Sequence, residues 1–573
     1  MRKIAKIMVV SLLMVILTMA LIACNDNSTH KGEFVHEINS VDDLKKVADM
    51  VGSDYDKGVF ELKNDIVIPA DENWTPIGTS VENSFRGTFN GNDHTITYKI
   101  NIPEPEDGRD TKAPLDDQKS FGLFGVIHNA KISKLNLSID ITVPADANSF
   151  YVGGLAGFAS GNNTIDDVEV NGNVETTLGD IRKILDEETQ LIEIERYDMA
   201  GFVGGVVGFI QGSTTLNNVS STTYIKVGAY SDKAAFDDLF VGGVAGAIRT
   251  VDLSSLKDNN EYASANNLSF AGSISASGSQ VNAGGIFGAA YRIKNGEKWN
   301  VSGNSINVKA YKRLRVGGLA GMIDRVTLSK AKVDLDTINA GAFSFSTSRS
   351  FNAGGAFGYV ANLSSLDNVI SDVKKVYVAK NTTNYTGGLV GTLHYSKLTS
   401  AVASGALYYG TDAIDDVKEI RYEGNTQNNH YYVYNGGIAG RVYGESSMAN
   451  ASSNFKAYQG IVGEAANAIE IVVLKDGETI TDWLNSSIYN TSMLTYAKIE
   501  ESNPKEGEVK YKIVHNFSLD DVSLTYVETN SKAYNDKQTN DKASTWYNEI
   551  GSKKADAITY NELYNTINSN INS

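Results

Sequence analysis

Few residues in this chain are arranged as catalysis or metal binding requires. The seven histidines are scattered, and no His-Glu-x-x-His segment places two of them on one face of a helix. No Gly-x-Ser-x-Gly turn presents a nucleophilic serine. Cys24 is the only cysteine, which excludes an internal disulfide and a zinc site built from several thiolates. We therefore expect no catalytic residue, no metal and no cofactor.

Four pairs of adjacent aspartates are the remaining candidates for ion binding or acid–base chemistry. They are Asp166–Asp167, Asp237–Asp238, Asp415–Asp416 and Asp520–Asp521. Each pair stands where a turn or the start of a strand is expected, so we interpret them as solvated turn residues. The alternative is that one pair binds calcium, because oxygen-rich loops suit that ion. No Asp-x-Asp-x-Asp-Gly loop is present.

Tyrosine, with 29 residues, offers a different chemistry, because its ring and hydroxyl together suit sugars and protein surfaces. Residues 405–435 form an insertion that is rich in tyrosine. The candidate ligand-binding residues there are Tyr408, Tyr409, Tyr431, Tyr432 and Tyr434. The alternative is ordinary strand packing, since strands favour tyrosine in any case.

The first 23 residues have the character of an export signal. A basic start is followed by an apolar run from Ile7 to Ala23, and the run ends at Leu21-Ile-Ala-Cys24. This ending resembles a bacterial lipobox, which implies that Cys24 is lipidated and becomes the first residue of the mature protein. Residues 24–33 then form a polar tether. The alternative is an uncleaved membrane-spanning helix; both place the remainder outside the cytoplasm, on the extracellular face of the membrane.

The formal net charge of −17 limits the kinds of molecule that the chain can bind. Removing the signal takes away three basic residues and no acidic ones, so the mature chain is still more negative. Such a field repels nucleic acid and anionic lipid headgroups. We therefore expect a soluble surface and no nucleic-acid partner.

An internal repeat predicts the fold. The segment Gly-Gly-Φ-x-Gly, with Φ aliphatic, occurs eight times, beginning at Gly153, Gly204, Gly242, Gly284, Gly317, Gly354, Gly387 and Gly436. The shortest interval is 33 residues, and shorter strand-like stretches ended by Gly, Asn or Asp follow each copy. Three short strands per repeat predict one coil of a parallel β-helix. Helices are excluded here, because glycine pairs would destabilise them. Both alternating sets of residues around the motif are apolar, so the sequence does not show which set points inward.

These repeats resemble the GLUG-motif family, whose glycine-rich core is similar to Val241-Gly-Gly-Val-Ala-Gly246. The resemblance covers residues 121–463 and implies a right-handed parallel β-helix on a bacterial surface lipoprotein. Residues 34–120, with Trp74-Thr-Pro-Ile-Gly78, are similar to the opening coils of such proteins. The family brings no catalytic residues. Some members are zinc peptidases, but no second histidine follows His36-Glu37 here as that module requires.

Both ends of a stack of coils need covering. Ser40-Val-Asp-Asp43 predicts the start of a helix with Leu44, Val47, Ala48 and Val51 on one face, either as a plug for the first coil or at its periphery. Residues 464–573 are expected to form a cap or a small α+β appendage. Strands are predicted at 469–474 and 509–514, and a helix after Thr559 with Leu563, Ile567 and Ile571 on one face. A partly helical acidic insertion is predicted at 176–199, around Ile181, Leu185, Leu191 and Ile194.

These features favour a non-enzymatic cell-surface lipoprotein. We expect an adhesin-like or scaffold module that binds an extracellular glycan or a host or matrix protein, and is attached to the membrane by its lipid. The alternative is a polysaccharide-binding or polysaccharide-degrading β-helix protein, which a groove lined by acidic pairs and tyrosines would favour. A third reading is an envelope or assembly component. This functional expectation rests on the predicted fold and the predicted lipid anchor alone, because no motif in the sequence identifies a ligand.

Overall fold

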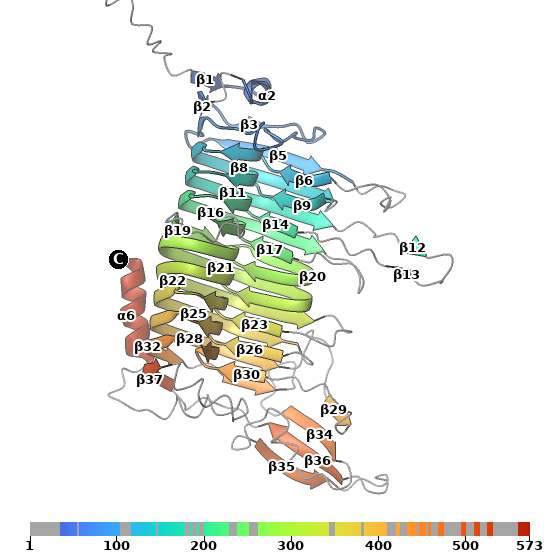
Figure 1. Ribbon diagram of the computed structural model, residues 1–573, viewed down its shortest axis with the longest axis vertical. Coiled ribbons are helices and arrows are strands. Elements are labelled where there is room, and N and C mark those ends of the chain that lie inside the picture. Colours follow the sequence, from blue (N-terminus) through green and yellow to red (C-terminus); the bar gives the residue numbers. More distant parts are fainter. Residues whose placement is uncertain are drawn as a thin grey trace, which may run out of the picture.

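The computed structural model is built almost entirely of strands, which stack along the long axis of the molecule (Figure 1). It describes residues 35–53, 57–103, 116–144, 147–177, 184–185, 192–193, 200–228, 238–250, 262–342, 350–379, 383–409, 420–423, 433–443, 446–453, 456–459, 468–474, 494–499, 509–515, 524–530 and 560–573. Its main sheet has 31 strands. The predicted all-β class is confirmed. No helix among the described residues is long and apolar enough to cross a membrane.

The repeats are in structural register. Gly204 pairs with Gly242, Gly242 with Gly284 and Gly284 with Gly317, in parallel. The first motif glycines of the later repeats continue the same row as far as Gly436. Repeats whose lengths differ in the sequence therefore meet at the same motif position.

Each repeat contributes three strand positions. First strands end at the glycine pair: β6 (Asp116–Phe121), β9 (Ala147–Val152), β14 (Ala200–Gly204), β17 (Asp238–Gly242), the ends of β20 (Ser273–Gly284) and β21 (Phe287–Gly317), β23 (Ser350–Gly354), β26 (Thr383–Gly387) and β30 (Val433–Gly436). Second strands follow directly: β7 (Phe124–His128), β10 (Ala156–Ser160), β15 (Val207–Gln211), β18 (Ala245–Arg249), the starts of β21 and β22 (Ala320–Ala342), β24 (Phe357–Ala361), β27 (Val390–His394) and β31 (Ala439–Tyr443). Third strands are β8 (Lys131–Pro144), β11 (Thr164–Thr177), β16 (Thr215–Gly228), β19 (Ala263–Phe270), the remaining parts of β20, β21 and β22, β25 (Ser365–Val378), β28 (Lys397–Tyr409), β32 (Ser447–Ser453) and β33 (Lys456–Gln459).

The interior is filled by ladders of like residues. The Φ residue of each motif is fully or almost fully buried, from Leu155 and Val206 to Ile438, and from Val152 to Thr386 so is the residue directly before the first glycine. Apart from Thr386, these residues belong to one continuous hydrophobic cluster. The inward face, which the sequence left open, is therefore the one that carries Φ and the residue before the glycine pair.

Each third strand bends at one residue with left-handed backbone. Asp167, Asn218 and Asn368 have φ of 58°, 52° and 54°, and the register of the flanking residues places the three in one row. Asparagine and aspartate tolerate this conformation better than most residues. The three residues lie inside strands β11, β16 and β25 and not in turns, and Lys298 and Lys330 hold the same left-handed position in β21 and β22.

The motif glycines are required by space and not by an unusual φ. A Cβ on Gly242 would overlap the carbonyl oxygen of Ala245, and one on Gly246 would lie 2.5 Å from the carbonyl oxygen of Gly208 in the neighbouring repeat. Backbone atoms of a packed sheet cannot yield as a flexible side chain can. The three glycines therefore let the chain pack tightly on itself and on the neighbouring repeat.

The N-terminal end carries a helix, as predicted. The strands there are β1 (Val35–Ile38), β2 (Val59–Leu62), β3 (Ile66–Val67), β4 (Thr88–Asn90) and β5 (Thr95–Asn101), and the helix is α2 (Val41–Met50). The Ser40 hydroxyl accepts a hydrogen bond from the Asp43 N–H, and the Asp43 carboxylate accepts one from the Asn39 N–H. Leu44 and Val47 join the interior cluster, whereas Ala48 is exposed, contrary to the prediction.

The C-terminal region has three parts. A separate four-stranded sheet combines β29 (Ile420–Glu423) with β34 (Ala468–Leu474), β35 (Leu494–Ile499) and β36 (Val509–His515), so the two predicted strands are confirmed and the tyrosine-rich insertion contributes a third. Strand β37 (Leu524–Asn530) pairs antiparallel with β32 and covers that edge. The predicted helix is α6 (Tyr560–Asn572). In the acidic insertion, the described residues form an antiparallel pair, β12 (Ile184–Leu185) and β13 (Ile192–Glu193), so the helix predicted around Leu185 is wrong.

Helix α6 lies along the side of the stack and does not close its end (Figure 1). Its buried face of Leu563, Ile567 and Ile571 packs on Ile370 of β25 and Val402 of β28. These two residues occupy an outward-facing row that holds the polar Lys332 in the preceding coil. The helix thus covers an apolar exterior patch formed by two adjacent strands.

We predict that Gly242→Ala lowers the free energy of unfolding by about 3 kcal/mol or more, because its Cβ meets backbone. The matched control is Gly228→Ala, where the nearest atom to a new Cβ is the Thr176 carbonyl oxygen at 4.0 Å. Guanidinium-induced unfolding followed by circular dichroism measures both. Equal effects of the two substitutions would contradict the steric explanation.

We also predict that Ile567→Asp detaches helix α6 and exposes Ile370 and Val402. Binding of a hydrophobic dye should rise and the C-terminus should become sensitive to protease, while the strand signal in circular dichroism is retained. Asn565→Asp, on the exposed face of the same helix, should change neither readout. A dye response as large for Asn565→Asp would rule out the packing described.

Candidate functional site

The tight bend at each glycine pair creates a second row of contacts on the exterior. The residue two positions before the first glycine and the residue directly after the last glycine face each other across the bend. Tyr151 and Phe158 stand in these positions, and their rings stack with centroids 5.1 Å apart. We name the exterior surface formed by these two positions in successive coils, with the strand residues next to them, the bend face.

The N-terminal part of the bend face is aromatic. The Phe202 and Phe209 rings lie 4.5 Å apart across one bend, and Phe202 stacks on Phe240 of the next coil at 4.9 Å, with the ring planes 6° apart. Together with Tyr151 and Phe158 these rings form a hydrophobic cluster separate from the interior core. Aromatic stacking of this kind stabilises the coils from outside, by about 0.5–1.5 kcal/mol per pair beyond area burial.

The middle of the bend face changes from rings to arginines. Arg249 lies over the Phe209 ring at 5.6 Å from its centroid, and Arg315 lies over the Tyr359 ring at 4.7 Å. Arg441 continues the pattern over Tyr385 at 4.9 Å. Cations over aromatic faces are stabilised by the ring quadrupole, more so where water is excluded. A chain of formal charge −17 thus concentrates arginines on one exterior face.

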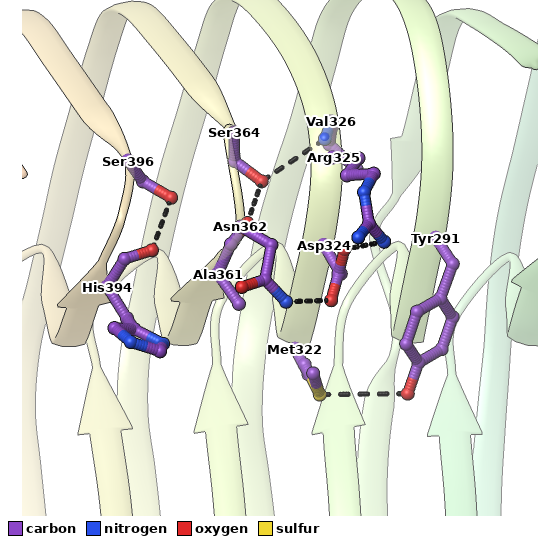
Figure 2. Close-up of polar contacts among 10 residues, drawn as sticks. All are labelled: Tyr291, Met322, Asp324, Arg325, Val326, Ala361, Asn362, Ser364, His394 and Ser396. Atoms are coloured by element: carbon purple, nitrogen blue, oxygen red, sulfur yellow. Dashed lines mark hydrogen bonds and ion pairs between the residues drawn. The ribbon is translucent and has the colours of Figure 1, made fainter. Parts of the chain in front are cut away.

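Carboxylates on this face are already engaged. Asp324 accepts hydrogen bonds from Arg325 at 3.0 Å and from the Asn362 side chain at 2.6 Å, so each of its oxygens has a partner (Figure 2). Asp238 pairs with Arg313 at 3.3 Å. No carboxylate among the described residues lies within ion-pair distance of Arg315, whose Nη1 instead donates to the Met322 sulfur at 2.8 Å. Burial lowers the pKa of the Arg315 guanidinium, and the neighbouring Arg313 lowers it further.

Two tyrosines border the arginines. Tyr291 donates its hydroxyl to the Met322 sulfur at 3.6 Å (Figure 2), and burial raises its pKa. The Tyr359 hydroxyl and the His394 Nδ1 are 3.2 Å apart. Burial lowers the pKa of His394, and the positive charge of Arg441 adds to this effect. The imidazole is therefore neutral at pH 7.

The candidate tyrosines predicted from the sequence lie on different strands where the structure describes them. Tyr408 is only 7% exposed and its ring stacks on Tyr377 at 5.1 Å. Tyr409 follows it on β28, a third strand, whereas Tyr434 lies on β30, a first strand, paired with Tyr385. Tyr431 and Tyr432 lie outside the described residues. Ligand binding by these five tyrosines stays a prediction.

The other candidates are placed as follows. Asp166 accepts a hydrogen bond from the Asn217 side chain at 2.6 Å, and Asp167 is the left-handed residue of strand β11. Within the described ranges no three side chains of His, Cys, Asp or Glu are grouped to hold a metal ion. Cys24, Asp237, Asp415–Asp416 and Asp520–Asp521 lie outside those ranges.

The bend face could not be predicted from the sequence, because its polar residues interrupt a row of positions that are aromatic in other repeats. The position two residues before the glycine pair is aromatic at Tyr151, Phe202 and Phe240, but it is Asn282 and Arg315 in the next two repeats. Without the structure, nothing tells whether this position points inward or outward.

Comparisons with protein-family models, with curated proteins and with solved structures find no match for this chain.

We predict that His394 titrates below its ordinary pKa of about 6.5. The folded state then holds fewer protons than the unfolded state, so stability falls as the pH drops from about 6.5 through the folded pKa. Titration followed by NMR, with the signal assigned by its loss in His394→Asn, measures the value. Arg441→Gln should raise it. A folded pKa at or above 6.5 would contradict the burial of this imidazole.

Proposed function

We propose that this chain is a lipid-anchored bacterial surface protein whose stacked strands form a parallel β-solenoid of GLUG-like repeats, and that it binds an extracellular polymer along the bend face. Support for the solenoid comes from the parallel pairing of successive glycine motifs and from the interior ladders. The lipid anchor rests on the Leu-x-Ala-Cys ending at Cys24.

The observation that carries the binding proposal is Arg315. It is a largely buried cation that rests on an aromatic ring, and no described carboxylate lies within ion-pair distance of it. Proteins seldom keep such a charge for stability, because burying an unpaired ion is costly. A solenoid offers similar side chains at intervals of about 4.8 Å along its axis, which suits an extended polymer. Non-enzymatic adhesion or scaffolding is therefore the function we favour.

A second candidate, polysaccharide degradation, is favoured by the Tyr359–His394 pair. A hydroxyl 3.2 Å from a neutral imidazole nitrogen, next to an arginine, has the parts of an acid–base pair. Release of reducing ends from a bound polysaccharide, lost in Tyr359→Phe, would establish this function. Binding without release supports the non-enzymatic proposal.

We predict that Cys24→Ser abolishes incorporation of radiolabelled palmitate and moves the protein out of the membrane fraction. Because Cys24 is the only cysteine, the substitution removes no other thiol.

On intact cells the wild-type chain should be accessible to added protease, and it should bind ligands on an array of glycans and matrix proteins. Unchanged palmitate labelling in Cys24→Ser would overturn the lipoprotein assignment, and a wild-type chain that binds nothing on the array would overturn the binding proposal.

A further inference from the structure

Helix α6 connects repeats that lie several strands apart. It contacts β22, β25, β28 and β32, which are third strands of four successive repeats. A 13-residue helix is about 20 Å long, whereas four neighbouring strands span about 14 Å, so one helix along the stack reaches all four (Figure 1). Repeats of a stacked protein as a rule contact only the next repeat. Helix α6 therefore adds a connection of longer range than strand pairing gives.

The contacts of α6 are made by side chains. Three of its aliphatic residues pack on the apolar patch of β25 and β28. The Asn570 side chain donates to the Asn368 side-chain oxygen at 3.0 Å, and the Tyr560 side chain forms a hydrogen bond with Ser404. The four strands beneath pair with one another in parallel. The helix can therefore leave the stack without breaking any of these strand pairs.

Away from the stack this helix has little stability of its own. Five of its 13 residues are asparagine, which favours helices only weakly. Isolated helices shorter than about 12–15 residues are marginal in water even when they are rich in alanine. The helix therefore forms only when it is docked, and the burial of its aliphatic side chains is opposed by the entropy of ordering the whole segment. Opening α6 then requires far less free energy than opening the strands, whose side chains fill the interior.

The strands beneath α6 lie where the stack is least secured. The ladder between β25 and β28 shifts register between Val373 and Lys375, and such a bulge leaves one residue outside the ladder. Ile370 and Val402, on which the helix packs, are paired on these same two strands. Towards the C-terminal end, β32 is followed by the antiparallel β37 and not by another parallel third strand. The helix thus crosses an irregular ladder close to the end of the stack, from which repeat proteins open most easily.

We propose that α6 is a strap that opens and closes on the folded stack, and that in its closed state it holds β25, β28 and β32 together against opening from the C-terminal end. When the strap is open, Ile370 and Val402 are uncovered and these strands are joined by their pairing alone. When it is closed, they open only together with the helix. The strap acts without a ligand and is independent of the binding proposed above.

Hydrogen exchange of the full chain in detergent, followed by mass spectrometry, tests the opening. In the wild type the amides of α6 should exchange about a hundredfold or more faster than those of β25 and β28, because releasing the helix leaves the strand pairs intact. Amides of α6 that are as well protected as those of β25 would show that the helix does not open separately, and would overturn the strap.

Two variants test whether the closed strap holds the strands. Ile567→Asp keeps the strap open and alters no strand, so exchange in β28 and β32 should become about tenfold faster or more, while β11 and β16 do not change. Asn565→Asp, on the exposed face of the helix, should leave all four strands unchanged.

Ile370→Lys with Val402→Ser releases the helix from the strand side. The two substitutions introduce the residue types that Lys332 and Ser452 already provide in the same row, so no apolar patch is left uncovered. Exchange in β28 and β32 should rise as it does in Ile567→Asp. A rise in this variant alone would assign the effect to the strands themselves, and no rise in either would show that α6 covers the stack without holding it. Both results would overturn the proposal.

Discussion

At each glycine pair the backbone comes so close to its neighbours that no side chain fits. A Cβ on Gly246 would lie 2.5 Å from the carbonyl oxygen of the glycine one coil earlier, and the other motif glycines are similarly enclosed. This contact lies between the first and second strands of a repeat, and the same glycines pair in register from repeat to repeat. The interior ladder of Φ residues and the exterior bend face are two sides of the same bend.

The bend face follows from this geometry. Residues on the concave side of a sharp bend are shielded by each other, so exterior side chains such as Phe158 and Phe209 are nearly as buried as core residues. Where aromatic rings fill the position, the result is added stability. Where arginine fills it, a charge is held in a place that water reaches poorly, and its interaction with an anion is strengthened. The same geometry thus yields packing where the position is aromatic and a poorly solvated positive charge where it is arginine.

The repeat was the part of the fold that the sequence could predict, because eight copies of one motif leave little freedom of register. The helices at Val41–Met50 and Tyr560–Asn572 were predictable from their caps and spacing, but the place of the second was not. Its partners Ile370 and Val402 are distant in sequence and resemble core residues. The bend face escaped prediction for a related reason, since apolar residues on both faces of a strand give no sign of direction.

The register of the stack is tested most directly by disulfide trapping. Glu175 and Lys226 are paired on adjacent third strands, 51 residues apart in the sequence, and both side chains reach the surface. In a Cys24→Ser background, Glu175→Cys with Lys226→Cys should form a disulfide under mild oxidation, because paired strands bring the two α-carbons within bonding range. Glu175→Cys with Tyr224→Cys, displaced by two residues on the same face, should not. Equal cross-linking of both pairs would contradict the in-register stack.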